Sequence, residues 1–237
     1  MKKVFTVLLG VLAVVTAYAQ AMDPFDSHVA DFRLLVNKKV QADIGLTKPQ
    51  IVLLNQYADQ NRTKIRAYQD QISRAGQDPR KISDNDPTLL KYFLELQGQV
   101  LSHLTKAQLR RLRELTLQSV GMRGMLDTVV SKKLGMTDAQ LTKARKVFEK
   151  GALANQKITQ AVYAQVIAPY KNVHPKTQAE EQKLNDQVRK QYDAALAKRK
   201  SEIEQLAKQT KKEFESVVTP KQLAAYKALG GKPFVRS

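Results

Sequence analysis

The three histidines are the residues best suited to hold a transition metal, and they are scattered along the chain. His28, His103 and His174 each lack a second His three or four residues away, and the chain contains no Cys. The carboxylates nearest to a histidine flank His28: Asp23, Asp26 and Asp31. Zinc and other soft metals need clustered His or Cys ligands. We therefore expect neither a metal site nor a cofactor, and a metal-responsive protein remains only a third alternative.

The sequence contains equally few residues in arrangements suited to catalysis. A Ser, Thr or Cys nucleophile needs a neighbouring base and a shaped turn, and no Ser lies in a Gly-flanked elbow. The chain has no Gly-rich phosphate loop, since Gly121, Gly124 and the Gly230-Gly231 pair read as helix junctions and ends. We predict that the protein is not an enzyme and has no catalytic residue.

Runs of basic residues are the remaining candidates for a functional surface. The candidates are Arg110, Arg111, Arg113, Lys198, Arg199, Lys208, Lys211 and Lys212. Such side chains attract acidic chains over a distance, and their aliphatic stems can cover apolar groups. The competing interpretation is that they form ordinary solvated helix faces.

The net charge of the chain is +18 and is unevenly distributed. Residues 22–120 carry 15 Lys and Arg against 11 Asp and Glu, whereas residues 121–237 carry 23 against 11. An exported basic chain rarely meets nucleic acid, so unfolded or acidic polypeptides are the expected partners and anionic envelope surfaces the alternative. A role of the charge in solubility alone also stays open.

The N-terminal segment predicts export. Lys2 and Lys3 precede an apolar run over 4–15, and small-residue cleavage sites follow at Ala17-Tyr18-Ala19 and Ala19-Gln20-Ala21. This order is typical of a secretory signal peptide over residues 1–21, and a retained anchor is the competing interpretation. We expect a periplasmic protein that is stabilised by packing, without disulfides.

Four times along the chain a Thr is followed three residues later by a Gln. The pairs are Thr47 and Gln50, Thr105 and Gln108, Thr137 and Gln140, and Thr219 and Gln222. The residue before each Thr is apolar: Leu46, Leu104, Met136 and Val218. In such a capping box the Thr side chain accepts from a helix N–H and the Gln side chain reaches back to the N–H of the Thr. Each of these Thr–Gln boxes therefore predicts a helix start.

The positions of the boxes indicate a duplicated unit. The segments before the first and third boxes align at an offset of 90 residues, and the second and fourth boxes align at an offset of 114. We expect an all-α, elongated fold of two tandem long antiparallel helical hairpins with short connecting helices, over 22–120 and 121–237. Apolar positions near 184–217 predict a return helix of some 40 residues in the second unit, roughly 60 Å long.

With a signal peptide and four boxes, the chain resembles the periplasmic LTxxQ proteins of the Spy/CpxP family. LTKPQ, LTKAQ and VTPKQ carry the resemblance, together with MTDAQ, which departs at its first residue. The resemblance implies a bent helical hairpin with two boxes that dimerises into a cradle. Four boxes would then be two such units in one chain, so that the chain either self-associates or forms a pseudo-dimer by itself.

The same resemblance implies three roles for the family: ATP-independent chaperone, envelope-stress regulator that dampens a sensor kinase, or metal-responsive protein. We expect a chaperone or holdase that binds partly unfolded or acidic clients through basic and apolar helix faces. A regulatory or scaffold protein with one specific envelope partner is the alternative.

Overall fold

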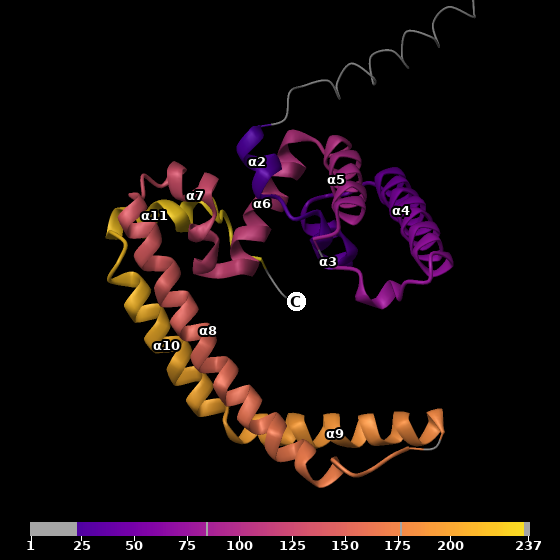
Figure 1. Ribbon diagram of the computed structural model, residues 1–237. Helices are drawn as coiled ribbons and strands as arrows, with labels where there is room; N and C mark the ends of the chain where they lie inside the picture. The colour runs from indigo at the N-terminus through magenta and orange to yellow at the C-terminus, as the bar shows by residue number, and fades with distance from the viewer. Residues whose placement is uncertain (1–22, 84, 176, 235–237) are drawn as a thin grey trace, which may run out of the picture. The chain divides into compact units, whose positions relative to one another are not determined.

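The computed structural model describes residues 23–83, 85–175 and 177–234. All regular secondary structure in these residues is helical, which confirms the all-α fold class (Figure 1). The α-helices before residue 121 are α2 (Pro24–Val29), α3 (Lys38–Asp43), α4 (Lys48–Arg74), α5 (Pro87–Ser102) and α6 (Lys106–Val120). Those after it are α7 (Thr128–Lys133), α8 (Asp138–Ile167), α9 (Gln178–Lys198), α10 (Lys200–Glu215) and α11 (Pro220–Leu229). Short 3-10 helices are η1 (Phe32–Val36), η2 (Pro79–Lys81), η3 (Gly121–Leu126) and η4 (Ala168–Tyr170).

The expected signal peptide, 1–21, lies outside the described residues. Among the helices that are described, none combines the length and the apolar character needed to cross a membrane.

The chain divides into two units near the predicted boundary. Unit 1 consists of two segments, the chain up to Gly121 and the chain from Lys227 onward, and unit 2 is Met122–Tyr226. The C-terminal residues therefore leave the unit in which the sequence placed them, 121–237. The physical reason is that Gln118 of α6 donates from Nε2 to the carbonyls of Gly230 (2.6 Å) and Lys232 (2.8 Å) and accepts from the N–H of Phe234 (2.8 Å).

In unit 1 the outgoing helix α4 packs against the return helix α5. The two run antiparallel, because Tyr57 contacts His103 and Lys64 pairs with Glu95 at 2.8 Å. Asp86 caps α5 by accepting from the N–H groups of Thr88 and Leu89. The core lies near the box end of this hairpin and under α6. Its most buried members are Leu112, Leu109, Ala30, Leu101, Val100 and Leu115.

In unit 2 the outgoing helix α8 packs against both α10 and α9. Phe148 and Phe214 meet with their ring centroids 5.1 Å apart, and Phe214 is fully buried. A further contact joins Tyr163 to Tyr192 on α9.

The predicted unbroken return helix of unit 2 is wrong, since it divides at Arg199 into α9 and α10, which meet at an angle (Figure 1). Arg199 lies four residues from Ala195 and four from Ile203, at a position that an apolar residue would need to occupy to continue the buried face. Its guanidinium instead pairs with Glu202, so the apolar face is interrupted where the helix breaks.

The elements that lead into the first and third boxes match in register. At the offset of 90 residues, η1 and α3 correspond to η3 and α7. Gly45 and Gly135 follow these short helices with φ of 68° and 63°. At both places the Gly N–H and the next N–H bond back to helix carbonyls, which is the Schellman end that favours glycine. The two units therefore build the approach to their boxes in the same way.

Candidate functional site

The two boxes of unit 1 lie against each other. Gln50 and Gln108 exchange hydrogen bonds between their carboxamides, with N···O distances of 2.9 and 3.1 Å. Each Gln Oε1 also accepts from the N–H of its own box Thr, at 3.0 Å in the first box and 2.9 Å in the second. The Nε2 groups further donate to main-chain carbonyls: Gln50 to His103 (2.8 Å) and Gln108 to Gly45 (2.9 Å). We refer to this reciprocal arrangement as the Gln clamp.

Unit 2 repeats the Gln clamp residue for residue. Gln140 and Gln222 exchange hydrogen bonds at 3.1 and 3.2 Å. Gln140 donates to the carbonyl of Val217 at 3.2 Å, and Gln222 donates to that of Gly135 at 3.0 Å. Every partner in this clamp is offset from its counterpart in unit 1 by 90 or 114 residues. The second Gln of each clamp is buried, with 8% of its surface exposed in both units.

The clamp explains why the repeated motif ends in Gln. Glu can accept from the Thr N–H, but it offers no N–H group for the second box. Sequence reasoning found the capping half of the motif and missed the clamping half. The signal was present, because Glu is as good a capping residue as Gln and yet Gln stands in all four boxes. A further capping box, Thr177 with Glu180, begins α9 and was also missed.

Two of the predicted partner-binding residues belong to the interior of unit 1. Arg111 pairs with Asp43 (2.6 Å) and Glu114 (2.9 Å) and is 8% exposed. Its hydrogen bond with Asp43 raises the pKa of Arg111 further. A second hydrogen bond joins its guanidinium to the Lys232 carbonyl at 2.7 Å. With four hydrogen bonds to Asp43, Glu114 and the Lys232 carbonyl, this arginine holds the C-terminal segment and has little donor capacity left for a partner protein.

Arg113 has the same kind of role. It pairs with Asp26 at 2.9 Å, donates to the Leu229 carbonyl and lies over the ring of Phe25. Only 7% of its surface is exposed. The prediction of Arg111 and Arg113 as client-binding residues is therefore wrong, since a run of basic residues in a sequence does not reveal the carboxylates that the fold brings to it.

The other predicted cations lie at or near the surface. Arg110, Lys198, Lys208 and Lys212 are exposed. Arg199 is half-buried beside Glu202, and Lys211 reaches Glu215 at a distance of 3.9 Å. Lys208 and Lys212 lie one turn apart on one face of α10, whereas Lys211 lies one turn from the buried Phe214.

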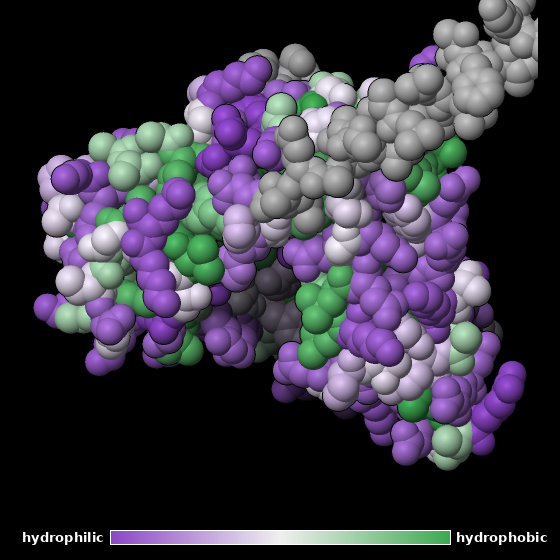
Figure 2. Space-filling model, turned by 90° about the horizontal axis from the view of Figure 1, so that it is seen from above, coloured by the Kyte–Doolittle hydropathy of each residue, from purple (hydrophilic) through white to green (hydrophobic). Residues whose placement is uncertain are grey.

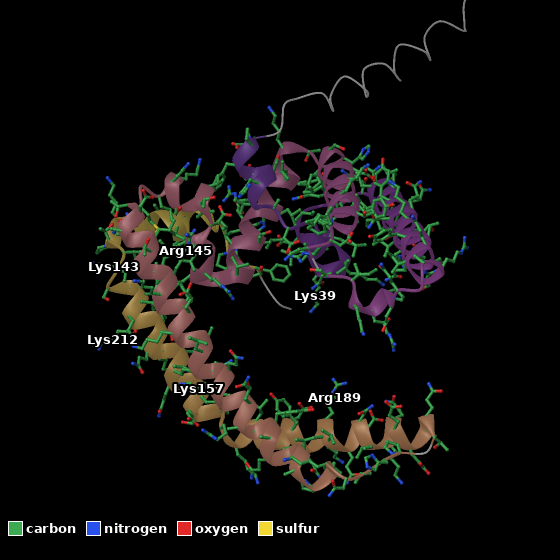
Figure 3. The ribbon with its side chains drawn as sticks, in the orientation of Figure 1. Lys39, Lys143, Arg145, Lys157, Arg189 and Lys212 are labelled. Carbon is green, nitrogen blue, oxygen red and sulfur yellow. The ribbon has the colours of Figure 1, made fainter. Side chains whose placement is uncertain are left out.

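The structure adds exposed cations that sequence reasoning did not select. Figure 3 shows Lys143, Arg145 and Lys157 on α8 and Arg189 on α9. Within the described part of the chain none of these four has a carboxylate partner. The signal in the sequence is the composition, since no Asp or Glu occurs between Glu149 and Glu180. Cations on α8 therefore have few acidic neighbours with which to pair.

Large apolar side chains are exposed in both units. Leu90, Phe93 and Leu94 recur at helical spacing on α5 of unit 1, with Leu94 62% exposed. In unit 2, Leu153 and Tyr163 are exposed on α8. Figure 2 shows the same mixture from above, with apolar patches set among polar residues. Apolar contact area and unpaired positive charge thus occur on the same helical surfaces of unit 2.

The histidines have separate surroundings. His103 Nε2 lies 2.7 Å from the Tyr57 hydroxyl, with the two rings stacked, and His174 is exposed. Among the described residues, no group of three or more His, Cys, Asp or Glu side chains is arranged to hold a metal ion.

No family model matches this chain, and neither a curated protein nor a solved structure matches it. The resemblance to the LTxxQ proteins therefore stays a prediction that rests on the boxes and on the leader-like N-terminus.

Proposed function

We propose that the protein is a periplasmic, ATP-independent holdase that captures partly unfolded, acidic polypeptides on the helices of unit 2. The observation that carries this proposal is the set of unpaired, exposed cations on α8, α9 and α10, which lies beside exposed apolar side chains such as Leu153 and Tyr163. Location in the periplasm rests on the leader-like N-terminus.

Two physical effects would cooperate in such capture. Unit 2 carries 20 Lys and Arg against 11 Asp and Glu, so its field attracts acidic chains before contact. Apolar side chains and the stems of Lys and Arg then cover the apolar segments that an unfolded client exposes. Because no hydrogen-bond pattern is required, the binding tolerates many client sequences. Neither effect consumes a nucleotide.

The test is the aggregation of an acidic model client with and without the mature protein. We expect suppression at low ionic strength that declines with added salt, as the Debye length falls from about 30 Å at 0.01 M to about 3 Å at 1 M. Absence of suppression at low salt, with the protein in several-fold molar excess, would contradict the proposal.

A matched pair of variants locates the effect. The unit 2 variant changes four unpaired cations to Gln: Lys143, Lys157, Arg189 and Lys212. The control variant makes the same change at four exposed cations of unit 1: Lys48, Arg66, Arg74 and Lys106. Both remove four positive charges. We expect the unit 2 variant to lose most of the suppression and the control to keep it, whereas equal losses would show that only total charge matters.

A further inference from the structure

A groove of about 470 Å³ lies between α8 and α10 in unit 2, closed at one side by η3. Its walls are mainly apolar, with Phe148, Ile203, Leu206 and Met122 contributing the large side chains. The volume lies within the range of about 300–1,000 Å³ that is typical of small-molecule sites, which combine apolar walls with a few polar groups.

Small residues form the middle of the groove. Gly151 lies so close to Thr210 that a Cβ at Gly151 would come within 2.6 Å of the Thr210 Oγ1. Ala152 and Ala207 border the same stretch and are exposed. Because these side chains are short, the larger ones around them border an apolar groove that is open to solvent. A single flexible chain fits such a groove better than a bulky ring does.

Two cations line the groove, Lys211 of α10 and Arg123 of η3. Lys211 follows Thr210, the residue that contacts Gly151, whereas Asn155 and Ile203 line the groove further from the start of α8. Arg123 enters from η3, is exposed, and has no carboxylate partner among the described residues. Among the described residues, the only anion paired with Lys211 is Glu215, at 3.9 Å. An exposed pair of that length is weak, so both cations can serve a ligand.

We infer that this groove binds a fatty acid, with the alkyl chain between α8 and α10 and the carboxylate near Arg123 or Lys211. The apolar walls favour an alkyl chain, and the two cations of the lining favour an anionic head. A neutral detergent would leave these cations without a partner, and a cationic one would be repelled by them. Fatty-acid binding at this site does not depend on the capture of clients elsewhere on unit 2.

The test is calorimetric titration of the mature protein with octanoate, decanoate and dodecanoate, each below its micelle concentration. We expect one ligand per chain and an affinity that rises by up to about fourfold for each added methylene until the groove is full. Dodecyltrimethylammonium should bind far more weakly than dodecanoate. Equal affinity of the two, or uptake of many ligands per chain, would overturn the inference.

Two alanines on α8 provide a matched pair of variants. Ala152→Phe fills the groove, whereas Ala164→Phe places the same ring on an exposed position outside it. We expect Ala152→Phe to weaken dodecanoate binding by at least about tenfold and Ala164→Phe to leave it unchanged. Equal binding by the two variants, both with the circular dichroism of the parent protein, would contradict the site.

The cations give a second readout that leaves the packing intact. Arg123→Gln and Lys211→Gln should each weaken dodecanoate binding by about two- to fivefold. Lys212→Gln, the next residue on α10 but outside the groove, is the control and should have no effect. An acidic peptide that displaces dodecanoate in the parent protein and binds more tightly would instead assign the groove to a polypeptide.

Discussion

The two units have the same Gln clamp but differ along their arms. In unit 1 the contact beyond the clamp is polar, between Tyr57 and His103. At the corresponding positions unit 2 has Val147 and Val217, and an aromatic pair, Phe148 with Phe214, lies next to them. The return arm of unit 1 is the single helix α5 of 16 residues, whereas unit 2 uses α9 and α10, of 21 and 16 residues. The clamp is thus the same in both units while the arms differ. This contrast separates the shared architecture from the surface proposed for function.

The largest effect should come from the contact between Phe148 and Phe214, whose counterparts in unit 1 are Ala58 and Val100. Phe214→Ala removes a fully buried ring and should lower the free energy of unfolding of unit 2 by about 3–5 kcal/mol. The corresponding change in unit 1, Val100→Ala, removes two methyl groups and should cost about 2 kcal/mol. Native-state hydrogen exchange reports each unit separately. Equal costs in the two units would contradict the assigned packing difference.

Removing a Gln of the clamp should lower the stability of each unit by a similar amount. Gln108→Ala and Gln222→Ala each remove the hydrogen bonds to a glycine carbonyl, to a Thr N–H and to the partner Gln, which keeps its other two bonds. Each substitution should lower the free energy of unfolding by about 2–3 kcal/mol, measured by urea denaturation. Gln56→Ala, at an exposed position of α4, serves as the control and should be neutral. An unchanged free energy of unfolding at either clamp position would show that the contact between the two boxes does not stabilise that unit.

The polar pair of unit 1 can be converted into its unit 2 counterpart. His103→Val takes away the partner of the Tyr57 hydroxyl and should cost about 1–2 kcal/mol of unfolding free energy. Adding Tyr57→Val recreates the Val147 and Val217 combination, so the double variant should cost less than the sum of the two single changes. Thermal or urea unfolding of the three variants gives the coupling. If the two single changes in unfolding free energy add up to that of the double variant, Tyr57 and His103 have no stabilising interaction with each other.

The smallest effect should be the acid sensitivity of the first return helix. The pKa of Asp86 is lowered, chiefly by the Leu89 N–H that it accepts from. A carboxyl whose pKa is lower in the folded than in the unfolded state stabilises the folded state above about pH 4. This stabilisation is lost as the pH falls through the pKa of the folded state. We expect the exchange protection of residues 88–91 to fall in that range. Asp86→Asn should remove this pH dependence.

The first helix of the return arm in unit 2, α9, provides the comparison. Thr177 caps α9 with a hydroxyl that does not titrate in acid. Its bond to the N–H of Glu180 should therefore survive where that of Asp86 is lost. If both helix ends fray together with falling pH, the Asp86 cap is not the cause.

Much of the fold could be predicted from the sequence because it depends on local chemistry. The box threonines and glutamines determine the helix starts through contacts within four residues, and the offsets of 90 and 114 residues predicted the repeated register. The reciprocal clamp joins residues 58 and 82 positions apart, and no local pattern reveals such a pairing. The burial of Arg111 and Arg113 depends likewise on Asp43, Asp26 and the C-terminal carbonyls, which only the tertiary structure brings to them.

The most direct test of the shared architecture is a double-mutant cycle at Gln50 and Gln108, repeated at Gln140 and Gln222. Each cycle measures the free energy of unfolding of the parent, the two single Ala variants and the double variant. We predict a coupling of about 1–2 kcal/mol that is the same in both units, because the carboxamide pairs have the same geometry. Coupling near zero in either unit would contradict the claim that its two boxes are held together by the glutamines.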